Sequence, residues 1–190
     1  MDPALIAMGV IALAELGDKT QLVALVLTQR LGRPVVVAGA MIMAMSLMHG
    51  LAAFVGAAID QLMPDFAETW LVGIGFVIMG LWMLRSPGQS GDEVHRIPGK
   101  GSAFVTALLV FCFLEFGDKS QLATVGLSIG LESTWQVWLG AAVGAMAVNL
   151  PIIWAGHKLQ RFIPDGLCKW MATGMFVLLG GWFLAGLIIG

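Results

Sequence analysis

Residues 14–22 read AELGDKTQL, and residues 114–122 read LEFGDKSQL. Each stretch places a glutamate, an aspartate and a lysine inside an otherwise apolar run. Even on lenient insertion scales, an aspartate or lysine at the centre of a membrane helix costs about 2.5–3.5 kcal/mol. A chain that places such groups there twice, at an offset of 100 residues, is expected to pair them with one another or with a ligand.

The offset of 100 residues extends over the whole chain. When residues 1–90 are compared without a gap with residues 101–190, 20 of the 90 positions are identical. Trp70 and Trp82, for example, recur as Trp170 and Trp182. The sequence therefore predicts two three-helix repeats, and a segment rich in Gly, Ser, Pro and charge is typical of a linker between them. The predicted boundaries are 1–85 for the first repeat, 86–101 for a cytoplasmic linker and 102–190 for the second repeat.

The composition indicates an all-α integral membrane protein. Charged residues make up 12% of the chain, whereas soluble domains have about 25%. Residues 34–59, 133–156 and 170–190 contain no Asp, Glu, Lys or Arg, and each run is as long as the roughly 20 residues that cross a bilayer. The N-terminus has no basic region ahead of its apolar run, so no signal peptide is expected. The six predicted transmembrane helices are residues 3–29, 35–59, 67–85, 102–131, 135–157 and 168–189.

The distribution of basic residues predicts the orientation in the membrane. Because each repeat has three spans, the two repeats are expected to be inverted, as in many secondary transporters. All eight Lys and Arg residues outside the two motifs follow the first, third or fifth span, and these loops share one face. By the positive-inside rule this face is cytoplasmic and both termini are extracytoplasmic. The eight residues are Arg30, Arg33, Arg85, Arg96, Lys100, Lys158, Arg161 and Lys169.

The spacing within the motif predicts a cluster of carboxylates. In a continuous helix, residues three apart share a face, so Glu15, Asp18 and Gln21 are expected to project together, with Lys19 on the flank. The second copy repeats this spacing, and the repeat is expected to bring the two copies face to face near the midplane. Four carboxylates against two ammonium groups leave a surplus of two negative charges, which one divalent cation or two protons would neutralise. The equivalent residues are Glu115, Asp118, Gln121 and Lys119, with Gly17 and Gly117 expected at the helix crossing.

The ligand types favour a hard cation. Carboxylate, amide and hydroxyl oxygens suit Ca²⁺, Mn²⁺ or Mg²⁺. Thr20, Ser120, Gln21 and Gln121 are candidates for additional ligands or for groups that orient them, and so are His49 and Asn149, which occupy equivalent positions of the two repeats. The sequence has no zinc-type Cys/His spacing, no phosphate loop and no nucleophile motif. We therefore expect no enzyme activity and no resident cofactor, and the basic residues form no stripe that would bind nucleic acid.

The paired motifs, ELGDKT at residues 15–20 and EFGDKS at residues 115–120, resemble those of the calcium/manganese:proton exchanger family. That family belongs to the lysine-exporter superfamily, and the resemblance implies that Glu15, Asp18, Glu115 and Asp118 form the metal site. The chain lacks the long acidic central loop of the eukaryotic members. The resemblance thus implies a bacterial exporter of Mn²⁺ in the cytoplasmic membrane. Its expected partners are Mn²⁺ or Ca²⁺, protons and membrane lipid, and a homo-oligomer is possible.

Three other functions are consistent with parts of the pattern. The chain is alternatively an exporter of a small cationic organic solute of the lysine-exporter type, whose amine would meet the acidic site. A membrane scaffold for metalloenzyme assembly would also retain the acids without transport. An intramembrane enzyme would need more than paired acids, and no nucleophile or catalytic metal motif accompanies them here.

Overall fold

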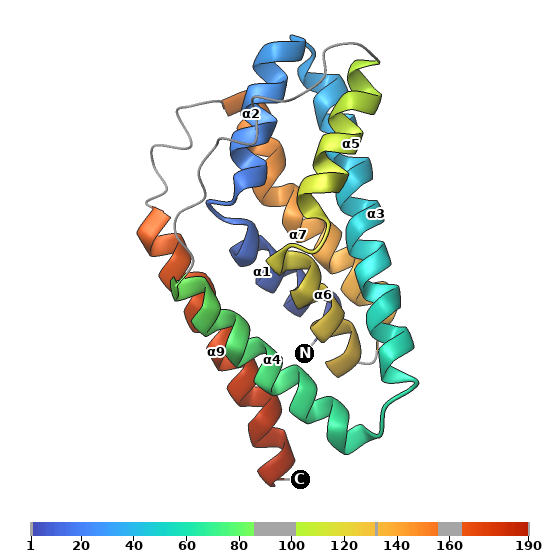
Figure 1. Cartoon of the computed structure of the whole chain (residues 1–190), viewed down its shortest axis with the longest axis vertical. Helices are drawn as coiled ribbons and strands as arrows, with labels where there is room; N and C mark the ends of the chain where they lie inside the picture. The colour runs from blue at the N-terminus through green and yellow to red at the C-terminus, as the bar shows by residue number, and fades with distance from the viewer. Residues whose placement is uncertain (1, 86–101, 132, 156–164, 190) are drawn as a thin grey trace.

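The computed structural model describes residues 2–85, 102–131, 133–155 and 165–189, which form eight α-helices and no strand (Figure 1). The prediction of an all-α chain is thereby confirmed for the described residues, and the predicted linker at 86–101 lies outside them. The helices are α1 (Pro3–Glu15), α2 (Lys19–Leu31), α3 (Pro34–Asp60), α4 (Asp65–Arg85), α5 (Ala103–Glu115), α6 (Lys119–Gly130), α7 (Thr134–Ala155) and α9 (Asp165–Ile189).

The helix boundaries repeat at the same offset as the sequence. Helices α1, α2, α3 and α4 begin at residues 3, 19, 34 and 65, and α5, α6, α7 and α9 begin 100 residues later. Equivalent helices run in opposite directions along the long axis: α1 and α2 rise in Figure 1, whereas α5 and α6 descend.

Contacts between equivalent helices are reciprocal, as expected at a two-fold axis. Helices α4 and α9 lie side by side in Figure 1, and Phe76 stacks on its own equivalent, Phe176, with ring centroids 5.8 Å apart. A Cβ atom built on Gly73 would lie 3.1 Å from the carbonyl oxygen of Gly180, and one on Gly80 would lie 3.1 Å from the carbonyl oxygen of Thr173. Positions 73 and 173 are equivalent in the two repeats, and so are positions 80 and 180. The two contacts are therefore the same contact made once from each repeat, which indicates pseudo-symmetry in space.

The two motifs interrupt their helices, which corrects one expectation. Helix α1 ends at Glu15 and α2 begins at Lys19, and α5 and α6 are separated in the same way. The predicted continuous helices over 3–29 and 102–131, with three motif side chains on one face, are therefore wrong. Gly17 and Gly117 have φ angles of 71° and 72°, a left-handed conformation that costs other L-residues roughly 1–2 kcal/mol. A Cβ on Gly117 would meet nothing within 4 Å, so this glycine is required by the backbone turn and not by a close helix crossing.

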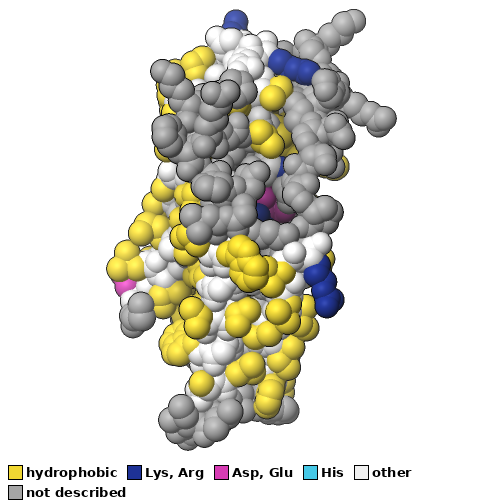
Figure 2. All heavy atoms as spheres, turned by 90° about the vertical axis from the view of Figure 1, so that its left-hand side faces the viewer, with side chains coloured by type: hydrophobic (Ala, Val, Ile, Leu, Met, Phe, Trp, Pro, Cys, Tyr) yellow, Lys and Arg dark blue, Asp and Glu magenta, His cyan; other side chains and the backbone are white. Residues whose placement is uncertain are grey.

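The outer surface is apolar. Helices α3 and α7 are the two described helices that are long and apolar enough to cross a membrane, and four shorter apolar segments accompany them. Large hydrophobic side chains are exposed, including Leu47 at 53%, Trp154 at 60% and Leu178 at 75%. Figure 2 shows hydrophobic side chains over much of one face. Contiguous apolar surface of this kind marks contact with lipid or partner proteins.

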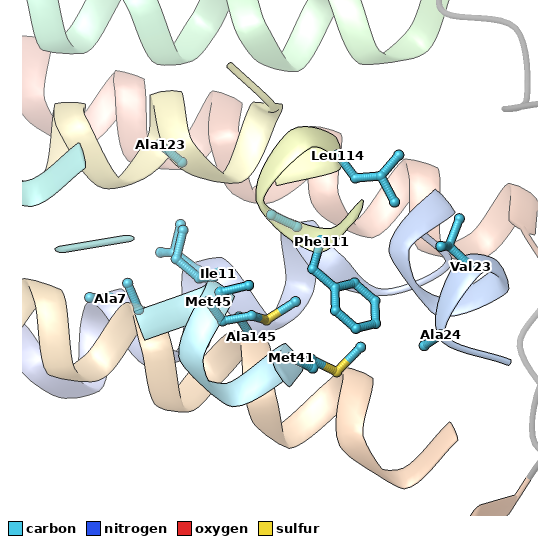
Figure 3. Close-up of a cluster of buried hydrophobic side chains, with 14 of the residues drawn as sticks. Ala7, Ile11, Val23, Ala24, Met41, Met45, Phe111, Leu114, Ala123 and Ala145 are labelled. Carbon is cyan, nitrogen blue, oxygen red and sulfur yellow. The ribbon is translucent and has the colours of Figure 1, made fainter. Parts of the chain in front are cut away.

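The buried core joins the two halves. Ile11 of α1, Met41 and Met45 of α3, and Phe111 of α5 lie in one cluster with Ala145 of α7 (Figure 3). Helix α7 also packs directly on the backbone of α1, because Cβ atoms on Gly140 and Gly144 would overlap the carbonyl oxygens of Ala4 and Met8. Small residues in a G-x-x-x-G spacing permit such close packing of helix backbones.

This contact predicts a specific loss of stability. Gly144→Ala should destabilise the protein by about 1–3 kcal/mol, the usual effect of overpacking, because the new methyl group would overlap the Met8 carbonyl oxygen. Gly9→Ala is the matched control, since a Cβ there meets nothing within 4 Å. Thermal unfolding of both variants in detergent measures the difference. Equal midpoints for the two variants would contradict the packing of α7 on α1.

Candidate functional site

The two interrupted helices bring the motifs into direct contact. Glu15 and Glu115 are the last residues of α1 and α5, and each is fully buried. Thr20, in the first turn of α2, donates a hydrogen bond from Oγ1 to Glu115 Oε1 at 2.7 Å. Residues 95 positions apart in the chain thus meet inside the molecule, where the non-helical backbone of a membrane protein is tolerated because protein surrounds it.

The lysines form ion pairs that cross between the motifs. Lys119 Nζ lies 2.7 Å from Asp18 Oδ1, and Lys19 Nζ lies 3.5 Å from Asp118 Oδ1. The first pair is the more enclosed, with side chains 14% and 0% exposed for lysine and aspartate, against 30% and 9% for the second. Sequence spacing placed each lysine beside the glutamate of its own motif, one turn away. The helix breaks redirect each lysine to the aspartate of the other motif, so the aspartate and lysine charges balance pairwise.

The glutamates accept hydrogen bonds from neutral side chains. Asn149 Nδ2 donates to Glu15 Oε2 at 2.9 Å, whereas Glu15 Oε1 is buried without a hydrogen-bond partner among the described residues. Glu115 accepts from Thr20 and, at 3.4 Å, from Ser120 Oγ. With both aspartates paired, these two carboxylates represent the surplus of two negative charges.

His49 completes a three-residue cluster with the glutamates. Glu15, His49 and Glu115 each offer one ligand atom, and these atoms lie within 4.8 Å of one another. His49 is 0% exposed, its Nδ1 lies 2.9 Å from Thr124 Oγ1, and its Nε2 has no hydrogen-bond partner in the described part of the chain. Oxygen ligands lie at 2.3–2.6 Å from Ca²⁺, so two ligands on opposite sides of one ion are about 5 Å apart. The donor atoms therefore fit around a single cation.

The predicted glutamines hold the interrupted backbone. Gln21 Nε2 donates to the backbone carbonyl of Glu15 at 3.3 Å. Gln121 accepts from the Gly117 backbone N–H at 2.9 Å and donates to the carbonyl of Met48 at 3.2 Å. Helix ends leave backbone groups without partners, and these amides satisfy some of them. Their observed contacts thus support the helix breaks.

Two residues near the site were not singled out from the sequence. Thr124 contacts His49, and Met45 Sδ lies 3.9 Å from Asn149 Nδ2. Both follow from helical spacing: Thr124 is four residues after Ser120, to whose carbonyl oxygen it donates at 2.8 Å, and Met45 is four residues before His49. Residues four apart on a helix are neighbours. Examining the positions four residues before and after each predicted site residue would therefore have identified both.

The interrupted helices also contribute to the electrostatics. The C-terminal ends of α1 and α5 meet the N-terminal ends of α2 and α6 at the motifs, and helix C-termini carry partial negative charge. Half-helix ends and unwound carbonyls bind cations in secondary transporters. Acidic and basic atoms are visible in a recess midway along the molecule in Figure 2. The arrangement is a largely buried anionic site suited to a small cation.

The crossed pairs predict unequal effects of removing each lysine. Lys119→Ala should destabilise the protein by about 3–5 kcal/mol, because it leaves a buried aspartate without its counter-charge. Lys19→Ala should cost less, since that pair is longer and water reaches its lysine more easily. Thermal unfolding in detergent, compared with wild type, gives both values. A larger loss for Lys19→Ala would contradict the arrangement described.

Comparison with known proteins adds independent observations. The sequence matches the family described as "Divalent cation/proton antiporter GDT1" over residues 3–90 and 103–188. It is 32% identical over 177 residues to a Vibrio cholerae protein named "Putative manganese exporter", covering 92% of this chain and 86% of that protein. It is 25% identical to GDT1-like protein 5 of Arabidopsis thaliana over 204 residues, with 88% of this chain and 89% of the relative covered. No solved structure matches the chain.

Proposed function

Because the chain belongs to the GDT1 family of divalent cation/proton antiporters, and is therefore a membrane transporter rather than an enzyme, we propose that it exports Mn²⁺ from the cytoplasm in exchange for protons. Ca²⁺ is the other ion that the carboxylate oxygens would accept. The name of the Vibrio cholerae relative, "Putative manganese exporter", supports the choice of Mn²⁺.

The observation that carries the proposal is the pair of buried glutamates beside balanced ion pairs. Asp18 and Asp118 have lysine partners, whereas Glu15, Glu115 and His49 each place one ligand atom within 4.8 Å of the others. In an interior of low dielectric constant, two carboxylate charges need compensation. One divalent cation or two protons supply it equally, and the site cannot comfortably hold both. This competition couples metal movement to proton movement.

The proposed cycle follows from that competition. Facing the cytoplasm, the deprotonated glutamates bind the metal ion. Facing the outside, protons displace the ion and return inward down their gradient. Because the lysines balance the aspartates throughout, exchanging one divalent ion for two protons is electroneutral. Asp18 and Asp118 belong to the proposed metal site as the groups that hold the two lysines. Thr20, Ser120 and Asn149 belong to it as donors of hydrogen bonds to the two glutamates.

The proposed architecture is six spans in two inverted repeats. In it, α1 with α2 and α5 with α6 each form one interrupted span, and the site lies near the midplane where discontinuous helices bind ions in secondary transporters. The opposite directions of equivalent helices support this assignment, as do the reciprocal contacts of α4 with α9. The repeat boundaries at 1–85 and 102–190 are part of the proposal.

The proposed location is a bacterial cytoplasmic membrane with both termini outside. Among described residues, the basic residues outside the motifs lie at the end of α2, at the start of α3, at the end of α4 and near the start of α9, which supports one basic face. They are Arg30, Arg33, Arg85 and Lys169. The alternative substrate, a small cationic organic solute, is disfavoured because the three candidate ligand atoms lie within 4.8 Å of one another, a separation that suits a single ion.

Metal-resolved flux in proteoliposomes tests the mechanism. Acidic pH on the side equivalent to the cell exterior should drive Mn²⁺ toward that side in wild type. Glu15→Gln and Glu115→Gln should each abolish this exchange, since each removes one of the two charges exchanged. Asp60→Asn, which removes a carboxylate at the end of α3, is the matched control and should exchange at the wild-type rate. Wild-type exchange in either glutamine variant would refute the proposed site.

Single-cysteine labelling tests the topology. In a background without Cys112 and Cys168, an impermeant thiol reagent added outside intact cells should modify Leu62→Cys, because Leu62 is 85% exposed in the loop between α3 and α4. The same reagent should spare Ser90→Cys in the proposed cytoplasmic linker until the membrane is permeabilised. The opposite labelling pattern would reverse the assigned orientation.

A further inference from the structure

We propose that His49 is a nitrogen ligand to the transported ion and makes the site prefer a first-row transition ion such as Mn²⁺ over Ca²⁺ and Mg²⁺. This inference rests on the proposed transport of a divalent cation. In that proposal, only the name of a relative favoured Mn²⁺ over Ca²⁺. It concerns a residue outside both motifs.

The hydrogen bonds around His49 determine its tautomer. Thr124 donates its one hydroxyl proton to the carbonyl oxygen of Ser120 at 2.8 Å. Thr124 Oγ1 therefore has only lone pairs for His49 Nδ1, 2.9 Å away, so Nδ1 carries the hydrogen and donates it. A neutral imidazole has one donor and one acceptor nitrogen. Nε2 is thus the nitrogen with the free lone pair.

The Nε2 atom of His49 has no hydrogen-bond partner among the described residues. His49 is 0% exposed, and Nε2 makes no hydrogen bond to any described residue, including the glutamates. Most buried polar side-chain atoms have a partner, so this one indicates a group that binds there. Glu15 Oε1 lacks a partner as well. One ring nitrogen of His49 and one carboxylate oxygen of each glutamate lie within 4.8 Å of one another, so both residues with an unpartnered atom belong to one cluster that a single ion would fit.

The contact with Thr124 matches the way proteins hold ligating histidines. A metal-bound histidine nearly always donates its other ring N–H to a neighbouring acceptor, which fixes the ring and its tautomer. Thr124 lies on α6 and His49 on α3, so the acceptor belongs to the second repeat and the ring to the first. The imidazole is therefore oriented before any ion arrives.

A nitrogen donor changes which ions the site prefers. Ca²⁺ and Mg²⁺ are hard ions that take oxygen ligands. Carboxylates suit Mn²⁺ as well as these two ions, whereas an imidazole nitrogen is a ligand of first-row transition ions and adds nothing to the binding of Ca²⁺ or Mg²⁺. A ligand set of two carboxylates and one imidazole suits Mn²⁺. For Ca²⁺, one of these three ligands, the imidazole, is unsuitable. The second repeat has Asn149 at the equivalent position, and its amide hydrogen-bonds Glu15. The chain thus provides one nitrogen ligand and one amide at a pseudo-symmetric pair of positions.

Electron spin-echo spectroscopy of Mn²⁺ bound to purified protein in detergent tests the ligand directly. Wild type should show ¹⁴N modulation from a directly bound imidazole, and ¹⁵N-histidine labelling should change it. His49→Asn, which installs the residue that the chain has at position 149, should remove the signal. A variant with His95→Gln and His157→Gln, both outside the described residues, should retain it. Bound Mn²⁺ without imidazole modulation in wild type would overturn the inference.

Competition experiments in proteoliposomes test the selectivity. Excess Ca²⁺ should inhibit Mn²⁺ flux in His49→Asn at least about tenfold more strongly than in wild type, in line with 10–100-fold losses from altered metal surroundings. Thr124→Val should shift selectivity in the same direction by a smaller factor, and Thr124→Ser should restore it. An unchanged Mn²⁺/Ca²⁺ preference in both His49→Asn and Thr124→Val would overturn the inference.

The two experiments separate this inference from the proposed function. If wild type shows the imidazole signal with Mn²⁺ but moves no ion under a pH gradient, the ligand assignment holds and the transport function fails. If wild type exchanges Mn²⁺ for protons and His49→Asn keeps its selectivity, the transport function holds and the ligand assignment fails. A His49→Asn variant that loses its fold is replaced by Thr124→Val, which leaves the imidazole in place.

Discussion

The structure depends on the compensation of charge in an interior that water scarcely reaches. Two lysines and four carboxylates lie where the surrounding surface is apolar, and each lysine is paired with the aspartate of the other motif. An uncompensated charge in such a place costs several kcal/mol, and in this structure each motif supplies the counter-charge for the aspartate of the other. The helices that carry the motifs also touch directly across the two halves, α1 against α6 and α2 against α5.

That pairing requires the helix breaks. In a continuous helix, Lys19 would lie one turn beyond Glu15 and on the same side, where it would neutralise a group that the site leaves available. The left-handed glycines at 17 and 117 end one helix and allow a second to begin in a new direction. Gln21 and Gln121 then bond backbone groups that the breaks expose. The glycine and the glutamine of each motif thus serve the interruption, and the glutamates are the residues proposed to exchange charge.

The sequence predicted the all-α class, because long apolar runs can be recognised without a structure. It also predicted a repeat with an offset of 100 residues, and the helix boundaries have the same offset. It failed at the geometry of the motif. The pattern Glu15, Asp18, Gln21 fits a helical face, and nothing in the spacing reveals that Gly17 adopts a positive φ. It also left Thr124 out, because a threonine in an apolar helix is common and its role depends on His49, 75 positions earlier in the chain. The partners of buried polar atoms are set by packing between distant segments.

The departures from symmetry carry information that the repeat itself does not. Two identical halves would place the same donors on either side of the axis, and an ion between them would meet matched pairs of ligands. Here the ion pair of Lys119 is shorter and more enclosed than that of Lys19, and position 49 holds histidine where position 149 holds asparagine. Both repeats must supply charges that compensate those of the other. This requirement constrains the residues that are identical at equivalent positions of the two repeats. The residues that differ at equivalent positions of the proposed site are free of that constraint, so it is there that a preference for one cation is expected to be encoded.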